Sequence, residues 1–169
     1  MRDLILWCFT HTRHFFGVVA TFCVSMLTVG WILQYAVGLT PCPLCIIQRF
    51  FFGGVGVTAF IAWLHGRGER VYLAVMFGLA LLGGLVAGRN VYIEWIPQGL
   101  DKKCIPWMES FTDWITVLFQ ATGDCTKRDW TLLGVSIPEW SLLAFIFLTV
   151  TTGWMLIKKT SNDPVSDQK

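Results

Sequence analysis

The chain has 169 residues, a length typical of one domain. Hydrophobic residues make up 54% of it and charged residues only 14%, and the mean hydropathy is +0.59. Too few charges are present to coat a water-soluble sphere, so the composition indicates a membrane protein. The formal net charge of +2 is too small to favour nucleic acid as a partner, and the sequence shows no basic face or stacking motif.

Four apolar segments are each near the length of about 20 residues that a helix needs to cross ~30 Å of hydrocarbon. Backbone groups find no water inside a bilayer, so each segment is expected to be an α-helix. The sequence therefore predicts an all-α, integral membrane four-helix bundle that forms a single membrane domain over residues 1–169. The first segment is too long for a signal peptide, and we expect it to be retained. The predicted spans are residues 15–37, 46–64, 71–93 and 140–157, with outer loops at 38–45 and 94–139.

Basic residues predict the orientation of these spans, because short cytoplasmic loops are rich in Lys and Arg. The loop at 38–45 has neither, and the loop at 94–139 has an acidic balance. Both termini are therefore expected in the cytoplasm, and the two outer loops on the other side of a bacterial inner membrane. That side is the oxidising periplasm, where disulfides persist. The basic residues that fall together on the cytoplasmic side are Arg2, Arg13, Arg67, Arg70, Lys158 and Lys159.

The long outer loop contains a second helical pattern, "WMESFTDWITVLF", at residues 107–119. Its apolar residues recur on one helical face, and Pro106 suits the start of a helix. We expect a short amphipathic helix that lies flat in the membrane interface. A helix packed on a small extramembrane cap is the alternative.

The chain has six cysteines, and four of them are expected to face the oxidising side: Cys42, Cys45, Cys104 and Cys125. Cys8 and Cys23 fall in the cytoplasmic leader and in the first span, and both are expected to be inert.

Three interpretations of the four outward cysteines compete. A zinc site is disfavoured because Cys104 and Cys125 are 21 positions apart, so no metal is expected. A bridge between those two cysteines could be purely structural. By contrast, a C-x-x-C disulfide between Cys42 and Cys45 closes so small a loop that it constrains little of the unfolded chain. That spacing is typical of a bond that opens and closes.

The position of this C-x-x-C favours redox chemistry. Pro41 disfavours helix at the preceding residue, and Pro43 is tolerated in the first turn of the next helix, so both cysteines sit at a helix N-terminus. The helix dipole there stabilises a thiolate. Arg49 is four residues beyond Cys45 and shares its helix face, and its charge further favours the thiolate.

Arginines within a span are functional candidates by default. For Arg49 the alternative is snorkelling to lipid headgroups, which lie close by. Arg89 nears the same membrane boundary and raises the same question. Two arginines at one depth, beside a thiolate, could bind a polar ring of a lipid-soluble carrier.

The electron acceptor is suggested by elimination. Closing a disulfide from two thiols releases two electrons. Ile46 follows Cys45, so there is no C-x-x-C-H haem motif, and the chain has no G-x-G-x-x-G fingerprint. A membrane-dissolved quinone accepts two electrons and needs no fold of its own.

Four spans, "PCPLC" followed by Arg49, the loop residue Cys104 and the string "GDCTKRDWTLLGVSIPEW" together resemble the disulfide bond formation protein B (DsbB) family. The resemblance covers residues 4–157. It implies a thiol:quinone oxidoreductase that reoxidises a periplasmic thioredoxin-like (DsbA-like) thiol oxidase, with ubiquinone or menaquinone as acceptor.

The resemblance also implies roles for single residues. Cys104 and Cys125 would form the disulfide offered to the partner, whose thiolate attacks Cys104. Cys125 would then exchange with Cys42, leaving Cys45 as the thiolate that contacts quinone, with Arg49 stabilising that state. Gln34 matches a position near the family's quinone site.

The sequence departs from the family pattern at Trp95, where some members have a histidine, and in the shorter interval between Cys104 and Cys125. Two other hypotheses remain open. One is a non-catalytic membrane scaffold with a structural loop disulfide. The other is an enzyme of the vitamin K epoxide reductase type. The order of the cysteines argues against it, because the C-x-x-C opens the second span and the paired loop cysteines come afterwards.

Overall fold

A computed structural model describes residues 12–38, 42–95, 131–132 and 134–162 of the chain. Four of its helices are long and apolar enough to cross a membrane, which confirms the predicted all-α membrane bundle. The predicted interfacial helix at 107–119 lies outside the described residues. The elements are α2 (Thr12–Ala36), α3 (Pro43–His65), α4 (Glu69–Trp95), β1 (Thr131–Leu132), β2 (Val135–Ser136) and α6 (Ile137–Asn162).

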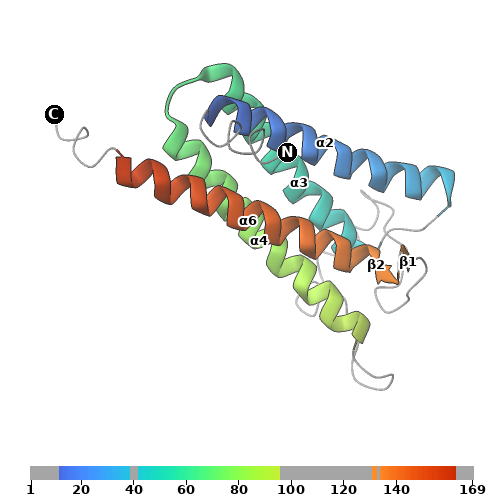
Figure 1. The fold of residues 1–169 in the computed structure, drawn as a ribbon. Helices are drawn as coiled ribbons and strands as arrows, with labels where there is room; N and C mark the ends of the chain where they lie inside the picture. Colours follow the sequence, from blue (N-terminus) through green and yellow to red (C-terminus); the bar gives the residue numbers. More distant parts are fainter. Residues whose placement is uncertain (1–11, 39–41, 96–130, 133, 163–169) are drawn as a thin grey trace, which may run out of the picture.

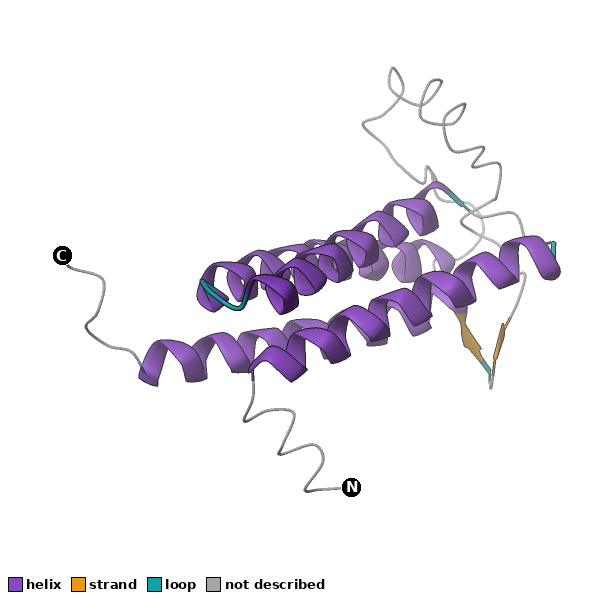
Figure 2. Cartoon of the chain, turned by 90° about the horizontal axis from the view of Figure 1, so that it is seen from above, coloured by secondary structure: helices purple, strands orange, loops and turns teal. Residues whose placement is uncertain are grey.

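The helices pack in chain order, with α2 against α3, α3 against α4, and α4 against α6. Each runs antiparallel to the one before it, so the ends alternate (Figure 1). The end of α2, the start of α3, the end of α4 and the start of α6 lie at one end of the bundle. The two short strands lie at that end in both views (Figure 2). We call it the cysteine end, because Cys42 and Cys45 are at the start of α3.

Both α3 and α6 begin three residues earlier than predicted from hydropathy alone, at Pro43 and Ile137. At α6 the helix start has one half of a capping box. The Glu139 carboxylate accepts a hydrogen bond from the Ser136 backbone N–H at 2.6 Å, which satisfies a donor that the helix start leaves free. The sequence "SIPE" carries this signal, but it lies outside the apolar run from which the span was predicted.

The interior combines large apolar side chains with small residues, and the small residues let the helices approach closely. A Cβ added at Gly83 on α4 would lie 2.3 Å from the ring of Phe145 on α6. That ring also stacks on Phe52 of α3, with centroids 4.1 Å apart. Gly83 is therefore a point where three helices meet and where only a hydrogen fits.

Large apolar side chains cover the outside of the bundle, as expected for a surface that faces lipid rather than water. All four helices contribute residues that are more than half exposed, among them Val24, Trp31, Val57, Leu64, Leu82, Leu85, Phe147 and Ile157.

Basic side chains gather at the other end of the bundle, which we call the basic end. Arg13 donates a hydrogen bond to the Trp63 carbonyl at 3.2 Å. Lys159 pairs with Glu69 at 2.9 Å, and Arg70 donates to the Lys159 carbonyl at 3.3 Å. The described basic residues near the helix ends thus group on one side, as the sequence predicted, opposite the cysteines.

A two-stranded ribbon leads into α6 and was not predicted from the sequence. Thr131 pairs with Ser136 and Leu132 with Val135, in antiparallel register. Gly134 has a φ of 81°, a conformation that glycine adopts without strain in so tight a turn. The ribbon lies at the cysteine end, immediately before α6 begins.

Candidate functional site

The candidate site begins with a cysteine that caps a helix. Cys42 is the N-cap of α3, with extended backbone angles (φ −76°, ψ 159°), and Pro43 fills the first helical position. The Cys42 sulfur accepts a hydrogen bond from the Cys45 backbone N–H at 3.3 Å, the role that a serine oxygen usually plays. The C-x-x-C spacing therefore gives each cysteine a fixed place in the first turn, as predicted.

The two sulfurs face each other. Cys42 Sγ and Cys45 Sγ are 2.7 Å apart. Both are free thiols, and the Cys42 thiol donates a hydrogen bond to the Cys45 sulfur. This hydrogen bond, together with burial, raises the pKa of Cys42. The raised pKa of Cys42 and the direction of this hydrogen bond both favour Cys42 as the thiol that donates to Cys45. The sulfurs of a disulfide bond are about 2.05 Å apart, so oxidation of this pair would require only a small movement.

The pair is covered from α4 by apolar side chains. Cys42 and Leu44 form a buried cluster with Ile93, against which Val86 and Cys45 pack. Cys42 is only 6% exposed, whereas Cys45 is partly exposed. As a whole residue, Cys45 is thus less enclosed than Cys42.

Arg49 joins α3 to α2 one turn further along. Its guanidinium donates hydrogen bonds to the Gln34 side-chain oxygen and, at 3.0 Å, to the Gly30 carbonyl. A Cβ on Gly30 would lie 3.3 Å from Arg49 Nε, so the missing side chain makes room for the guanidinium. Arg49 is therefore held against α2 one helical turn beyond Cys45, rather than extended freely toward headgroups.

The structure thus brings together Cys42, Cys45, Arg49 and Gln34, four of the residues selected from the sequence. Arg89 is half-buried on α4, but the α4 residue that reaches the sulfurs is its neighbour Asn90. Cys104 and Cys125 lie outside the described residues, so their pairing stays a prediction.

Asn90 is the site residue that sequence reasoning missed. It is fully buried, and its side-chain nitrogen lies 3.4 Å from Cys45 Sγ and 3.7 Å from Cys42 Sγ. The available signal was an uncharged amide within an apolar span. That signal was overshadowed by the charge of Arg89 next to it.

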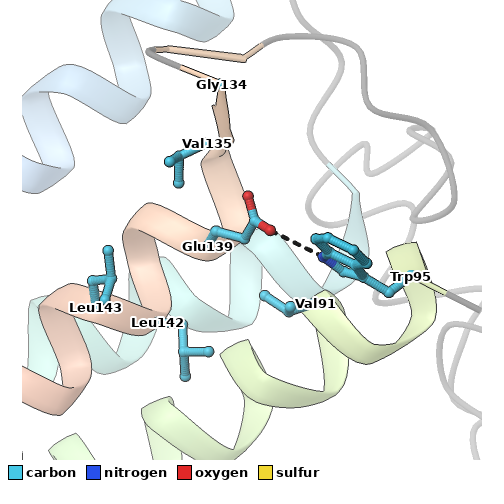
Figure 3. Close-up of a pocket in the computed structure, with 7 residues that line it drawn as sticks. All are labelled: Val91, Trp95, Gly134, Val135, Glu139, Leu142 and Leu143. Atoms are coloured by element: carbon cyan, nitrogen blue, oxygen red, sulfur yellow. Dashed lines mark hydrogen bonds between the residues drawn. The ribbon is translucent and has the colours of Figure 1, made fainter.

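A separate pocket of about 610 Å³ opens between α4 and α6 at the cysteine end (Figure 3). At its edge, Trp95 Nε1 donates a hydrogen bond to Glu139 at 2.9 Å. Trp95 therefore links the end of α4 to the start of α6. The lining is mostly apolar and includes neither Cys42 nor Cys45: it comprises Val91, Trp95, Gly134, Val135, Glu139, Leu142 and Leu143.

Taken together, four membrane-crossing helices with a C-x-x-C at the start of one of them define a class, the membrane proteins of thiol–disulfide exchange. Comparison with known proteins identifies the family. The family model described as "Disulfide bond formation protein DsbB" matches residues 12–155, and the chain belongs to this family.

Related proteins carry the same description. The chain is 41% identical to disulfide bond formation protein B of Aromatoleum aromaticum over 162 residues, covering 90% of this chain and 96% of the relative. It is 39% identical to the protein of that name from Azoarcus sp. over 153 residues (85% and 92%). Disulfide bond formation protein B 1 of Pseudomonas aeruginosa is 37% identical over 143 residues (79% and 88%). The chain is therefore a membrane protein of disulfide bond formation.

Proposed function

We propose that the chain is a thiol:quinone oxidoreductase of the bacterial inner membrane, with both termini in the cytoplasm. In this proposal it reoxidises a periplasmic thioredoxin-like thiol oxidase and passes two electrons to ubiquinone or menaquinone. One observation carries the proposal: Cys45 lies in the first turn of a membrane span, paired with Cys42 and one turn from an arginine that α2 holds in place.

The residues around Cys45 fit a quinone ring. Arg49 and Gln34 offer polar side chains at the level of the sulfur, and the ring's carbonyl oxygens need hydrogen-bond donors of the kind that a guanidinium supplies. The surrounding helix surfaces are apolar and face lipid, as an isoprenoid tail requires. A quinone bound there supplies an acceptor for two electrons and two protons.

The chain's own cysteines carry the exchange. The partner's thiolate attacks Cys104 of a Cys104–Cys125 disulfide, and Cys125 leaves as a thiolate. Cys125 then attacks Cys42 of the Cys42–Cys45 disulfide, forming a Cys42–Cys125 bond and releasing Cys45 as a thiolate. The helix N-terminus and Arg49 stabilise that charge. The partner's second thiol then attacks its own sulfur in the mixed disulfide and releases Cys104, and Cys104 attacks Cys125, which restores the Cys104–Cys125 bond and releases Cys42. One partner dithiol is thereby oxidised per turnover, and its two electrons and two protons leave with the acceptor as the Cys42–Cys45 disulfide re-forms.

Purified protein tests this with a reduced thioredoxin-like oxidase and a short-chain quinone, whose loss of absorbance is followed. We expect Cys45→Ser to abolish quinone reduction, because no thiolate remains at the acceptor. The same variant should still form a mixed disulfide between Cys104 and the partner. Quinone reduction near the wild-type rate in Cys45→Ser would overturn the mechanism, whereas a wild-type protein that reduces no quinone would favour the scaffold hypothesis.

A further inference from the structure

The buried amide of Asn90 has no evident role in holding the fold together. Asn90 is 0% exposed and lies on the α4 face that covers the cysteines, beside Ile93 and Val86. Within the part of the chain that the structure describes, its Oδ1 has no hydrogen-bond partner. Burying an amide with an unsatisfied oxygen destabilises a fold, and a leucine of similar size would pack there without that loss.

The contacts of the amide nitrogen point to the sulfurs instead. Asn90 Nδ2 is 3.4 Å from Cys45 Sγ and 3.7 Å from Cys42 Sγ, so it contacts both atoms of the reacting bond and is closer to Cys45. A hydrogen bond donated to an ionised acceptor is much stronger than one to a neutral acceptor. The contact therefore gains strength when Cys45 carries a charge.

The groups around Cys45 come from two sides. On α3 are the Cys42 thiol, which donates to Cys45 Sγ, and Arg49, which α2 holds through Gln34. On α4 the polar contact with the sulfur is that of Asn90. Asn90 thus adds a hydrogen-bond donor from the α4 side to the groups that the α3 side supplies.

We propose that Asn90 is a catalytic residue of the Cys42–Cys45 centre, where its amide N–H holds the negative charge of the Cys45 thiolate when the disulfide is reduced. The proposal deepens the proposed function and rests on it. Reduction breaks the S–S bond and adds two electrons, both supplied by thiols. Cys42 takes a proton or enters a mixed disulfide, and Cys45 retains the charge that Asn90 stabilises. By favouring the reduced state, Asn90 makes the disulfide a stronger oxidant.

The test isolates the pair in the full chain, with the four other cysteines replaced by serine. Asn90→Leu and Asn90→Met remove the donor and nearly keep the volume, and Asn90→Gln keeps an N–H donor. Thr152→Val is the matched control, because Thr152 is an equally buried polar residue on α6 whose hydroxyl bonds only to its own helix. Two quantities are measured: the equilibrium constant with a glutathione redox buffer, and the alkylation rate of each cysteine at neutral pH.

We expect Asn90→Leu to shift the equilibrium about tenfold toward the disulfide, a fall in reduction potential of about 30 mV for a two-electron couple. Alkylation of Cys45 should slow about tenfold, while alkylation of Cys42 changes little. Asn90→Met should shift both about as far, Asn90→Gln should recover part of the loss, and Thr152→Val should stay within twofold of the wild type.

Values for Asn90→Leu within twofold of the wild type would overturn the proposal. If Asn90→Leu does not fold, equal potentials for Asn90→Met and Asn90→Gln would overturn it instead. Neither measurement uses quinone or the partner. A wild-type protein that fails to reduce quinone therefore refutes the proposed function, whereas an unchanged potential in the variants refutes the role of Asn90.

Discussion

Arg49 shows how a charged side chain in a span is distinguished from one that merely reaches for headgroups. Its guanidinium bonds to the Gly30 carbonyl and to Gln34, both on the neighbouring helix. A snorkelling arginine needs no such partners. The fixed position keeps a positive charge one helical turn from Cys45, where the proposed function requires it.

Replacing Arg49 should therefore reduce activity more than it reduces stability. We expect Arg49→Met to lower kcat/KM for quinone at least tenfold, or about 1.4 kcal/mol of transition-state stabilisation. Arg49→Lys keeps the charge but loses the two-point geometry, and should fall between the two. Steady-state kinetics with a short-chain quinone measure the effect.

Arg13→Met is the control for this series, because Arg13 also donates to a carbonyl of a neighbouring helix, but at the basic end. Its kcat/KM should stay within twofold of the wild type. An equal loss of activity in both variants would mean that Arg49 acts only through helix packing.

At the scale of the element, two glycines on α4 differ sharply in their surroundings. A Cβ on Gly83 would meet the Phe145 ring at 2.3 Å, whereas a Cβ on Gly78 would meet nothing within 4 Å. Replacing each glycine by alanine thus separates two effects on stability: the loss of close packing at Gly83, and the greater helix preference of alanine, which acts alone at Gly78.

We expect Gly83→Ala to destabilise the bundle by about 1–3 kcal/mol, the usual range for an overpacked core. Gly78→Ala should be neutral or stabilising by up to about 1 kcal/mol, because alanine is the better helix former. Thermal unfolding in detergent measures both. An unfolding temperature of Gly83→Ala at or above the wild-type value would contradict the close contact of α4 with α6.

The sequence predicted the helices well and their first residues poorly. Apolar length alone identified all four spans. The starts of α3 and α6 depend instead on capping by Cys42 and by Ser136 with Glu139, residues that lie outside the apolar runs. Hydropathy measures the membrane-buried stretch, whereas helix ends are determined by local hydrogen bonds.

The site was predictable where local spacing determines it. Cys42, Cys45 and Arg49 share the first turns of one helix, so their proximity follows from helical geometry. Asn90 was not predictable in this way. Helix α4 is apolar on every side, with exposed Leu82 and Leu85 facing away from its buried residues, so no amphipathic pattern indicates which face meets α3.

At the scale of the whole molecule, the two ends of the bundle differ in chemistry. Arg13, Arg70 and Lys159, in the terminal turns of their helices, lie at one end, and the cysteine pair lies at the other, with Arg49 and Arg89 further inside the spans. By the preference of basic residues for the cytoplasm, the cysteine end should face the periplasm.

Labelling of intact cells tests this orientation. In a chain without its native cysteines, Thr131→Cys at the cysteine end should react with a membrane-impermeant maleimide. Arg67→Cys, in the turn between α3 and α4, should react only after the inner membrane is permeabilised. Both positions are exposed. The reverse pattern would require the opposite orientation of all four spans.

The shallow position of Cys45 has an energetic consequence for a living cell. Cys45 is the third residue of a 23-residue helix, about 3 Å below its start at 1.5 Å per residue. A charge that crosses the whole membrane changes its energy by about 2.3 kcal/mol per 100 mV. A thiolate formed so near one boundary passes through only a small part of that voltage. Charging and discharging this sulfur is therefore almost independent of the membrane potential, and turnover should continue in cells whose potential has collapsed.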